Sequence, residues 1–280
     1  MENLVSTHWL ADNLGAADLF VLDASAHLPD AGRDPAADFA AGHIPGARFL
    51  DLPSFYDPDS PVPSALPTAT QFAQRMGALG VPAGARVVVY DDSYIKTAAR
   101  AWFICRMHGM QVAILDGGLG KWRAEGRPLE SGTPSVAPVE HMPGTGPAPV
   151  RFKADMLANI DSRAEQVVDA RHAARFTGEM PDFRPEIASG HIPGSRNVVF
   201  DEVLNEDGTY KSPAEIRAVF QAAGVDLAQP IVTTCGGGVT AAVLMVALEQ
   251  AGKHDVALYD GSWSEWGADP ALPVETGPAR

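Results

Sequence analysis

Cysteine is scarce in this chain of 280 residues, which contains only Cys105 and Cys235. Two cysteines cannot form the disulfide framework of a small secreted domain, so the sequence predicts a reducing, cytoplasmic environment. Long apolar runs are also missing, and none approaches the 18 residues of a membrane span. The first 15 residues lack the basic and apolar regions of a signal peptide, which favours the same location.

Positive charge is in short supply as well. The chain has 21 Lys and Arg residues against 35 Asp and Glu residues, for a formal net charge of −14. An acidic surface repels phosphate backbones and anionic lipids, so we expect neither nucleic acid nor a membrane as a partner. Small anionic substrates remain compatible with this composition, because they respond to the local charge of a site.

The sequence repeats itself in three places. "VLDAS" at 21–25 matches "VVDAR" at 167–171, "AGHIPGARF" at 41–49 matches "SGHIPGSRN" at 189–197, and "LDGGLGKW" at 115–122 matches "YDGSWSEW" at 259–266. The order is the same and the spacing nearly constant, which indicates a tandem duplication. We predict a first domain at 1–130, a Pro/Gly-rich linker at 131–150 and a second domain at 151–280.

Short apolar runs alternate with longer amphipathic ones inside each copy. The runs expected to be buried strands are 21–24, 87–90 and 112–115 in the first copy, and 167–170, 231–234 and 256–259 in the second. Residues 212–224 are typical of a helix, with Ser212 and Glu215 placed to form a capping box. Each copy is therefore expected to be an α/β domain, a mainly parallel sheet with helices on both faces.

The stretch "TTCGGGVTAA" at 233–242 places Cys235 directly after a predicted core strand. A helix ending at Gly252 is expected to follow, so the glycines form the turn between strand and helix. Open α/β sheets bind ligands at this edge, and successive loop amides with a helix N-terminus attract negative charge. Such a position favours the thiolate, which is the nucleophilic form of cysteine. We predict Cys235 as the catalytic residue, cradled by the amides of Gly236, Gly237, Gly238, Val239 and Thr240.

The first copy serves as an internal comparison. Aligning "VVVYDDS" with "IVTTCGG" places Asp91 opposite Cys235, so the first domain is expected to lack a nucleophile. A cysteine is more often a small buried apolar residue than a nucleophile. Cys105 has no glycines nearby and lies within a predicted helix, so it fits that ordinary role.

Two other cysteine chemistries fit less well. The phosphatase pattern C-x5-R requires an arginine at position 241, where this chain has Ala241. A Cys–His pair could use His43 or His191, both within "GHIPG". The histidine is present in both copies while the cysteine is present in one, which favours a role in loop structure.

Taken together, the two "GHIPG" segments, the "DGSWSEW" ending and the loop at Cys235 resemble the two-domain rhodanese superfamily. Within it, the chain is most similar to the 3-mercaptopyruvate sulfurtransferases, over Val21 to Trp266. The resemblance implies two rhodanese-like domains, with the second active, and sulfur transfer through a cysteine persulfide. It implies no metal or organic cofactor.

Donor specificity in this family follows the residues around the cysteine. Thiosulfate-using members carry basic side chains directly after it, where this chain has Gly236 and Gly237. Mercaptopyruvate-using members hold the substrate with two arginines, which match Arg175 and Arg184. On this resemblance we expect these arginines to bind the donor, because a guanidinium fork suits a carboxylate.

The chain also departs from the family pattern. Gly237 stands where the family has a serine, and Pro53 and Ser64 stand where its aspartate and histidine partners are expected. The resemblance thus implies persulfide chemistry without the family's Ser-His-Asp arrangement.

The expected reaction moves sulfur from 3-mercaptopyruvate to a thiol or cyanide acceptor and releases pyruvate. The partners would be a small-molecule sulfur donor and a thiol acceptor, either a thioredoxin-like protein or a small thiol. Two alternatives stay open: a thiosulfate sulfurtransferase, and a persulfide carrier or sensor with low turnover.

Overall fold

The computed structural model describes residues 1–182 and 184–279, and its chain divides into two compact units. The first unit comprises Met1–Pro58, Leu66–Ala148 and Glu206–Thr209. The second comprises Asp59–Ala65, Pro149–Asn205 and Tyr210–Arg280. Two short segments, Asp59–Ala65 and Glu206–Thr209, therefore lie outside a simple sequential division of the chain.

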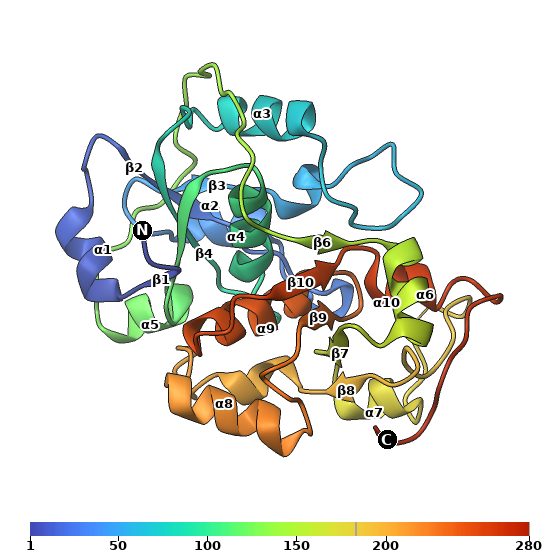
Figure 1. Cartoon of the computed structure of the whole chain (residues 1–280). Helices are drawn as coiled ribbons and strands as arrows, with labels where there is room; N and C mark the ends of the chain where they lie inside the picture. Colours follow the sequence, from blue (N-terminus) through green and yellow to red (C-terminus); the bar gives the residue numbers. More distant parts are fainter. Residues whose placement is uncertain (183, 280) are drawn as a thin grey trace. The chain divides into compact units, whose positions relative to one another are not determined.

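Each unit contains one five-stranded sheet, and its paired strands are parallel (Figure 1). The first sheet has the order β1(Leu4–Val5), β5(Gln111–Leu115), β4(Arg86–Tyr90), β2(Leu19–Asp23), β3(Arg48–Phe49). The second has the order β6(Val150–Arg151), β10(Val256–Tyr259), β9(Ile231–Thr234), β7(Gln166–Asp169), β8(Arg196–Asn197). The predicted fold class, two tandem α/β domains with parallel sheets, is confirmed.

Helices and short 3-10 turns connect these strands. In the first unit they are α1(Thr7–Asn13), η1(Pro29–Ala31), α2(Pro35–Ala41), η2(Leu52–Phe55), α3(Ala69–Ala78), α4(Ala98–Met107) and α5(Gly118–Ala124). In the second they are α6(Lys153–Ser162), α7(Ala173–Thr177), η3(Phe200–Val203), α8(Pro213–Ala222), α9(Val239–Gln250) and α10(Ser262–Trp266). The predicted capping box of Ser212 and Glu215 is present at the start of α8.

Both faces of each sheet are covered, which explains the continuous apolar strands. In the first unit, Val88 of β4 packs in one cluster with Leu10 of α1, Phe39 of α2 and Trp122 of α5. Its neighbour Val87 points to the opposite face and is also fully buried. Strands that are buried on both faces read as unbroken apolar runs, so the sequence pattern identified them correctly.

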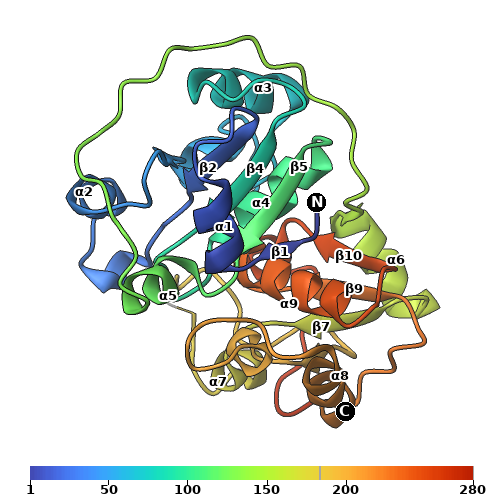
Figure 2. The same ribbon diagram turned by 90° about the vertical axis from the view of Figure 1, so that its left-hand side faces the viewer.

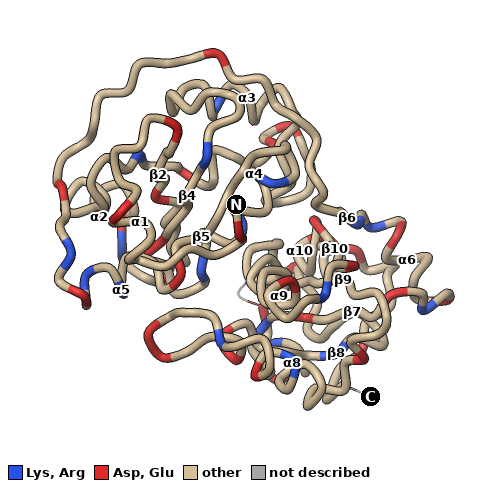
Figure 3. Tube along the Cα trace, turned by 60° about the vertical axis from the view of Figure 1, so that its left-hand side comes forward, with Lys and Arg blue, Asp and Glu red and all other residues tan. Residues whose placement is uncertain are grey.

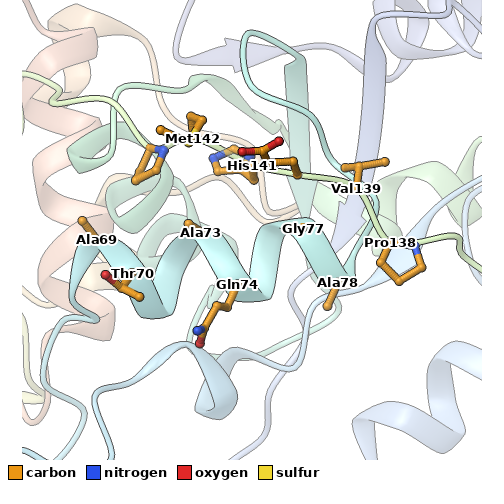
Figure 4. Close-up of a pocket in the computed structure, with 12 residues that line it drawn as sticks. Ala69, Thr70, Ala73, Gln74, Gly77, Ala78, Pro138, Val139, His141 and Met142 are labelled. Atoms are coloured by element: carbon orange, nitrogen blue, oxygen red, sulfur yellow. The ribbon is translucent and has the colours of Figure 1, made fainter.

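The Pro/Gly-rich stretch after α5 runs as an extended trace over α3 (Figure 2). Its residues up to Ala148 belong to the first unit. The amide of Val139 donates a hydrogen bond of 3.0 Å to the carbonyl of Gly77 in α3. Figure 4 shows Val139 and His141 lying across the face of α3 that carries Gly77. The stretch is thus packed against the first unit along its length.

The close approach of Val139 to Gly77 leaves little room for a side chain at position 77. A Cβ at this position would lie 2.5 Å from the carbonyl oxygen of Val139, so the chain would have to shift. Gly77→Ala should therefore lower the free energy of unfolding by about 1–3 kcal/mol, although alanine is the better helix former. Gly120→Ala in α5, where nothing lies within 4 Å, should instead raise it by about 0.5–1 kcal/mol. Urea unfolding of both variants tests this, and equal effects at the two positions would contradict it.

Candidate active site

Cys235 lies at the carboxyl end of β9, as predicted. The four residues of that strand are buried, and the loop 235–238 leads directly into α9. Gly238 is the N-cap of α9 and has a left-handed backbone with φ of 78°. Only glycine adopts this conformation at little cost, so Gly238 allows the chain to turn from strand to helix within three residues of the cysteine.

The sulfur of Cys235 faces the backbone of this loop. The amide of Gly238 donates a hydrogen bond of 3.1 Å to Sγ, and Cys235 is 2% exposed. An N–H donor stabilises an anionic sulfur more than a neutral thiol, and the first turn of α9 adds its own partial positive charge. Of the five residues predicted to form the cradle, Gly238 is the one with a hydrogen bond to the sulfur in the described part of the chain.

Residues 262–264 form hydrogen bonds with the backbone of the 235–238 loop. Trp263 donates its backbone N–H to the carbonyl of Cys235 at 2.9 Å, and Ser264 donates its own to the carbonyl of Gly236 at 2.8 Å. The Ser262 hydroxyl accepts a hydrogen bond of 3.3 Å from the amide of Cys235. These residues belong to the "DGSWSEW" segment, which the sequence showed as a repeat and as part of the family resemblance, without a structural role. Their hydrogen bonds hold the backbone of the loop in place, which gives the segment a structural role in the second unit.

Arg175 and Arg184 are brought together by a residue that the sequence analysis missed. Arg175 donates to the Asp182 carboxylate at 2.6 Å, and Arg184 donates to it through Nε at 2.9 Å and Nη2 at 3.2 Å. Burial is the largest influence on the pKa of Asp182 and would raise it. The hydrogen bonds from Arg184 and the charges of both arginines outweigh burial, so the pKa is lowered and the carboxylate is ionised.

Arg184 is also linked to the cysteine loop. Its Nη1 donates a hydrogen bond of 2.8 Å to the Ser264 hydroxyl, which in turn donates to the carbonyl of Gly236. One serine thus connects a predicted substrate-binding arginine to the residue that follows the predicted nucleophile.

A cavity of about 480 Å³ opens beside these residues within the second unit. Arg184 and Ser264 line it together with Lys153, Asp269 and the 61–63 segment. A cavity of this size accommodates a small ligand, and its wall carries the guanidinium of Arg184. Three carboxylates also line it, those of Glu186, Glu265 and Asp269, so attraction of an anion would depend on the positions of Arg184 and Lys153 and not on the net charge of the lining.

Ser64 lies next to Gly237. A Cβ placed on Gly237 would be 3.7 Å from the Ser64 hydroxyl oxygen and 3.8 Å from that of Ser264, both ordinary contacts. A serine side chain would therefore fit at position 237. The side chain that faces it is a hydroxyl, not the imidazole that the family pattern implies.

The corresponding site of the first unit holds a carboxylate. Asp91 follows β4, is 5% exposed, and accepts hydrogen bonds from the amides of Ser93 at 3.0 Å and Ala98 at 2.6 Å. Ala98 is the first residue of α4. Burial raises the pKa of Asp91. The position that holds sulfur in the second unit is thus filled by an internal carboxyl group in the first.

The two "GHIPG" histidines occupy equivalent structural positions. The Nδ1 atoms of His43 and His191 lie 2.8 Å from the carbonyl oxygens of Phe39 and Phe176, respectively. Each imidazole stacks on the ring of the same phenylalanine, and both histidines are buried. These contacts confirm that the histidines organise their loops.

Cys105 is buried within α4, and burial raises the pKa of its thiol to about 12. In the described residues, no group of three or more His, Cys, Asp or Glu side chains could hold a metal ion. None of the helices described is long and apolar enough to cross a membrane.

Comparisons with family models and with curated proteins point to the same family. The model of the rhodanese-like domain matches twice, at residues 6–125 and 153–269. A 3-mercaptopyruvate sulfurtransferase of Rattus norvegicus is 44% identical over 270 residues, which cover 94% of this chain and 91% of the relative. A thiosulfate sulfurtransferase of Cricetulus griseus is 40% identical over 273 residues, which cover 94% and 91%.

Solved structures agree with the sequence relatives. The crystal structure of SseA from Escherichia coli, described as a 3-mercaptopyruvate sulfotransferase with the rhodanese fold, superposes with a TM-score of 0.85 at 37% identity. The match covers 94% of this chain and 99% of that structure. The chain therefore belongs to the rhodanese superfamily of sulfurtransferases, as a member with two rhodanese-like domains.

Proposed function

We propose that this protein moves a sulfur atom from 3-mercaptopyruvate to a thiol or cyanide acceptor through a persulfide on Cys235. The observation that carries the proposal is the hydrogen bond from the Gly238 amide to Sγ, at the carboxyl end of β9. A sulfur in this position has an N–H donor and a helix N-terminus to stabilise its negative charge. The similarity to 3-mercaptopyruvate sulfurtransferases supports the choice of donor.

In the first half-reaction the Cys235 thiolate attacks the sulfur of 3-mercaptopyruvate. A sulfur–sulfur bond forms while the carbon–sulfur bond breaks, and its electrons pass to the carbon skeleton as the enolate of pyruvate. A proton from solvent then gives pyruvate. Arg184 and Arg175 are proposed to hold the carboxylate and keto oxygens of the donor, since guanidinium groups pair well with oxyanions.

In the second half-reaction an acceptor thiolate attacks the outer sulfur of the persulfide. The new sulfur–sulfur bond forms on the acceptor, and the Cys235 thiolate leaves. We propose a thioredoxin-like protein or a small thiol as the acceptor, in a reducing cytoplasm where the unpaired cysteines stay reduced. The first domain is proposed to take no chemical part, because Asp91 replaces the nucleophile there.

Thiosulfate is the second candidate donor. A relative named thiosulfate sulfurtransferase is 40% identical to this chain, so sequence similarity alone does not separate the two. Uncharged glycines follow Cys235, which favours the α-keto acid over a donor that needs basic side chains at these positions. A persulfide carrier with low turnover would release a single stoichiometric burst of pyruvate instead of turning over steadily.

Turnover should depend on Cys235 and not on Cys105. With 3-mercaptopyruvate and excess thiol acceptor, the wild type should release pyruvate steadily. Cys235→Ser should release none above background, because a hydroxyl cannot form a persulfide, while Cys105→Ser, if folded, should keep turnover. Continuous pyruvate assays check this. A single stoichiometric burst from the wild type would contradict an enzymatic role and favour the carrier.

The planar fork of Arg184 should matter more for 3-mercaptopyruvate than for thiosulfate. Arg184→Lys keeps the charge but loses the paired donors, so we expect KM for 3-mercaptopyruvate to rise about tenfold and KM for thiosulfate to change less than about threefold. Arg217→Lys in α8 changes a surface arginine of the same unit and is the matched control. Equal changes for both donors would count against binding of the carboxylate by Arg184.

Restoring the serine and the histidine of the family pattern should accelerate pyruvate release. A Cβ at position 237 makes only ordinary contacts, and Ser64 has φ of 60°, a conformation that histidine tolerates better than most residues. Gly237→Ser/Ser64→His should raise kcat for 3-mercaptopyruvate by at least about tenfold through proton transfer. Gly237→Ser alone, which supplies no base, should raise it less than about twofold. A double variant no faster than the wild type would show that proton transfer does not limit this protein.

A further inference from the structure

We propose that Asp182 is a specificity-determining residue, which sets the charge of the donor site so that monoanionic donors are preferred over dianionic ones. This inference rests on the proposed function, since it concerns which sulfur donor the arginines accept. Asp182 acts through the arginines and not by touching the donor, so it is a positioning residue.

Asp182 is placed to act on both arginines at once. Its two carboxylate oxygens accept hydrogen bonds from Arg175 and from Arg184, at distances between 2.6 and 3.2 Å. The Asp182 side chain is 3% exposed, whereas those of Arg175 and Arg184 are 27% and 24% exposed. The carboxylate is therefore buried, and the two arginines are the more exposed members of the cluster.

The charges of this cluster leave one net positive charge. The two guanidinium groups are cationic, and the carboxylate is ionised because the arginines hold the pKa of Asp182 low. Lys153 and Asp269, which line the adjoining cavity, form an ion pair of 3.3 Å and add no net charge. Glu186 and Glu265, also in the lining, oppose any second negative charge on the ligand.

The two candidate donors differ by one negative charge. 3-Mercaptopyruvate has a single carboxylate beside a thiol that is mostly protonated near neutrality. Thiosulfate carries two negative charges. The attraction of the arginines acts on both donors, but the repulsion by Asp182 grows with the donor's charge, so the shared carboxylate penalises thiosulfate more. Asp182 therefore shifts the relative preference toward the monoanion.

The test compares Asp182→Asn with the wild type on both donors at one low salt concentration, because salt screens the effect. The ratio of kcat/KM for 3-mercaptopyruvate to kcat/KM for thiosulfate should fall about tenfold in Asp182→Asn. Asp182→Glu keeps the charge and should preserve the ratio within about threefold. Glu165→Gln removes a carboxylate that pairs with Arg151 elsewhere in the second unit, and should leave the ratio unchanged.

The outcomes separate the inference from the proposed function. A wild type that forms no persulfide with 3-mercaptopyruvate overturns both. A wild type that turns over while Asp182→Asn loses both donors equally overturns the charge role and leaves Asp182 as a purely structural clamp. If the asparagine variant does not fold, as shown by its thermal unfolding curve, Asp182→Ser is measured under the same criterion.

Discussion

The hydrogen bond between a loop amide and the Cys235 sulfur is the interaction on which the chemistry that we propose for this protein depends. It exists because β9 ends at Thr234 and α9 begins at Val239, so the intervening loop must turn sharply. Gly238 makes that turn with a left-handed backbone and donates the hydrogen bond itself. The segment 262–264 prevents the loop from relaxing by bonding the carbonyls of Cys235 and Gly236. Geometry that stabilises an anion is thus built into the backbone.

The two units carry different side chains at the equivalent loop position after the central strand. Each unit has a parallel sheet and a loop that leads from a central strand to a buried helix. In the first unit the Asp91 carboxylate accepts hydrogen bonds from the amides of Ser93 and Ala98, whereas in the second the sulfur of Cys235 accepts one from the amide of Gly238. Acidic and basic residues lie along both units (Figure 3), and the excess is acidic. In our proposal, donor recognition therefore depends on a local pair of arginines and not on the overall charge.

The sequence predicted the central strands, the α8 capping box and the position of Cys235, because each depends on residues close together in the chain. Strands of two residues, such as β3 and β6, are too short to show a pattern and were not predicted. Asp182 and Ser264 were missed because their importance comes from contacts, and Ser264 bonds Arg184 across 80 residues of sequence. Asp182, two residues before Arg184, could have been found by asking what neutralises two neighbouring arginines.

The central claim is that Cys235 carries the transferred sulfur, and peptide mass spectrometry tests it most directly. The protein is treated with one equivalent of 3-mercaptopyruvate without acceptor, then digested under conditions that preserve persulfides. Our account predicts one additional sulfur atom on the peptide that contains Cys235 and none on the peptide that contains Cys105. Additional sulfur on Cys105, or pyruvate formed without a modified Cys235, would contradict it.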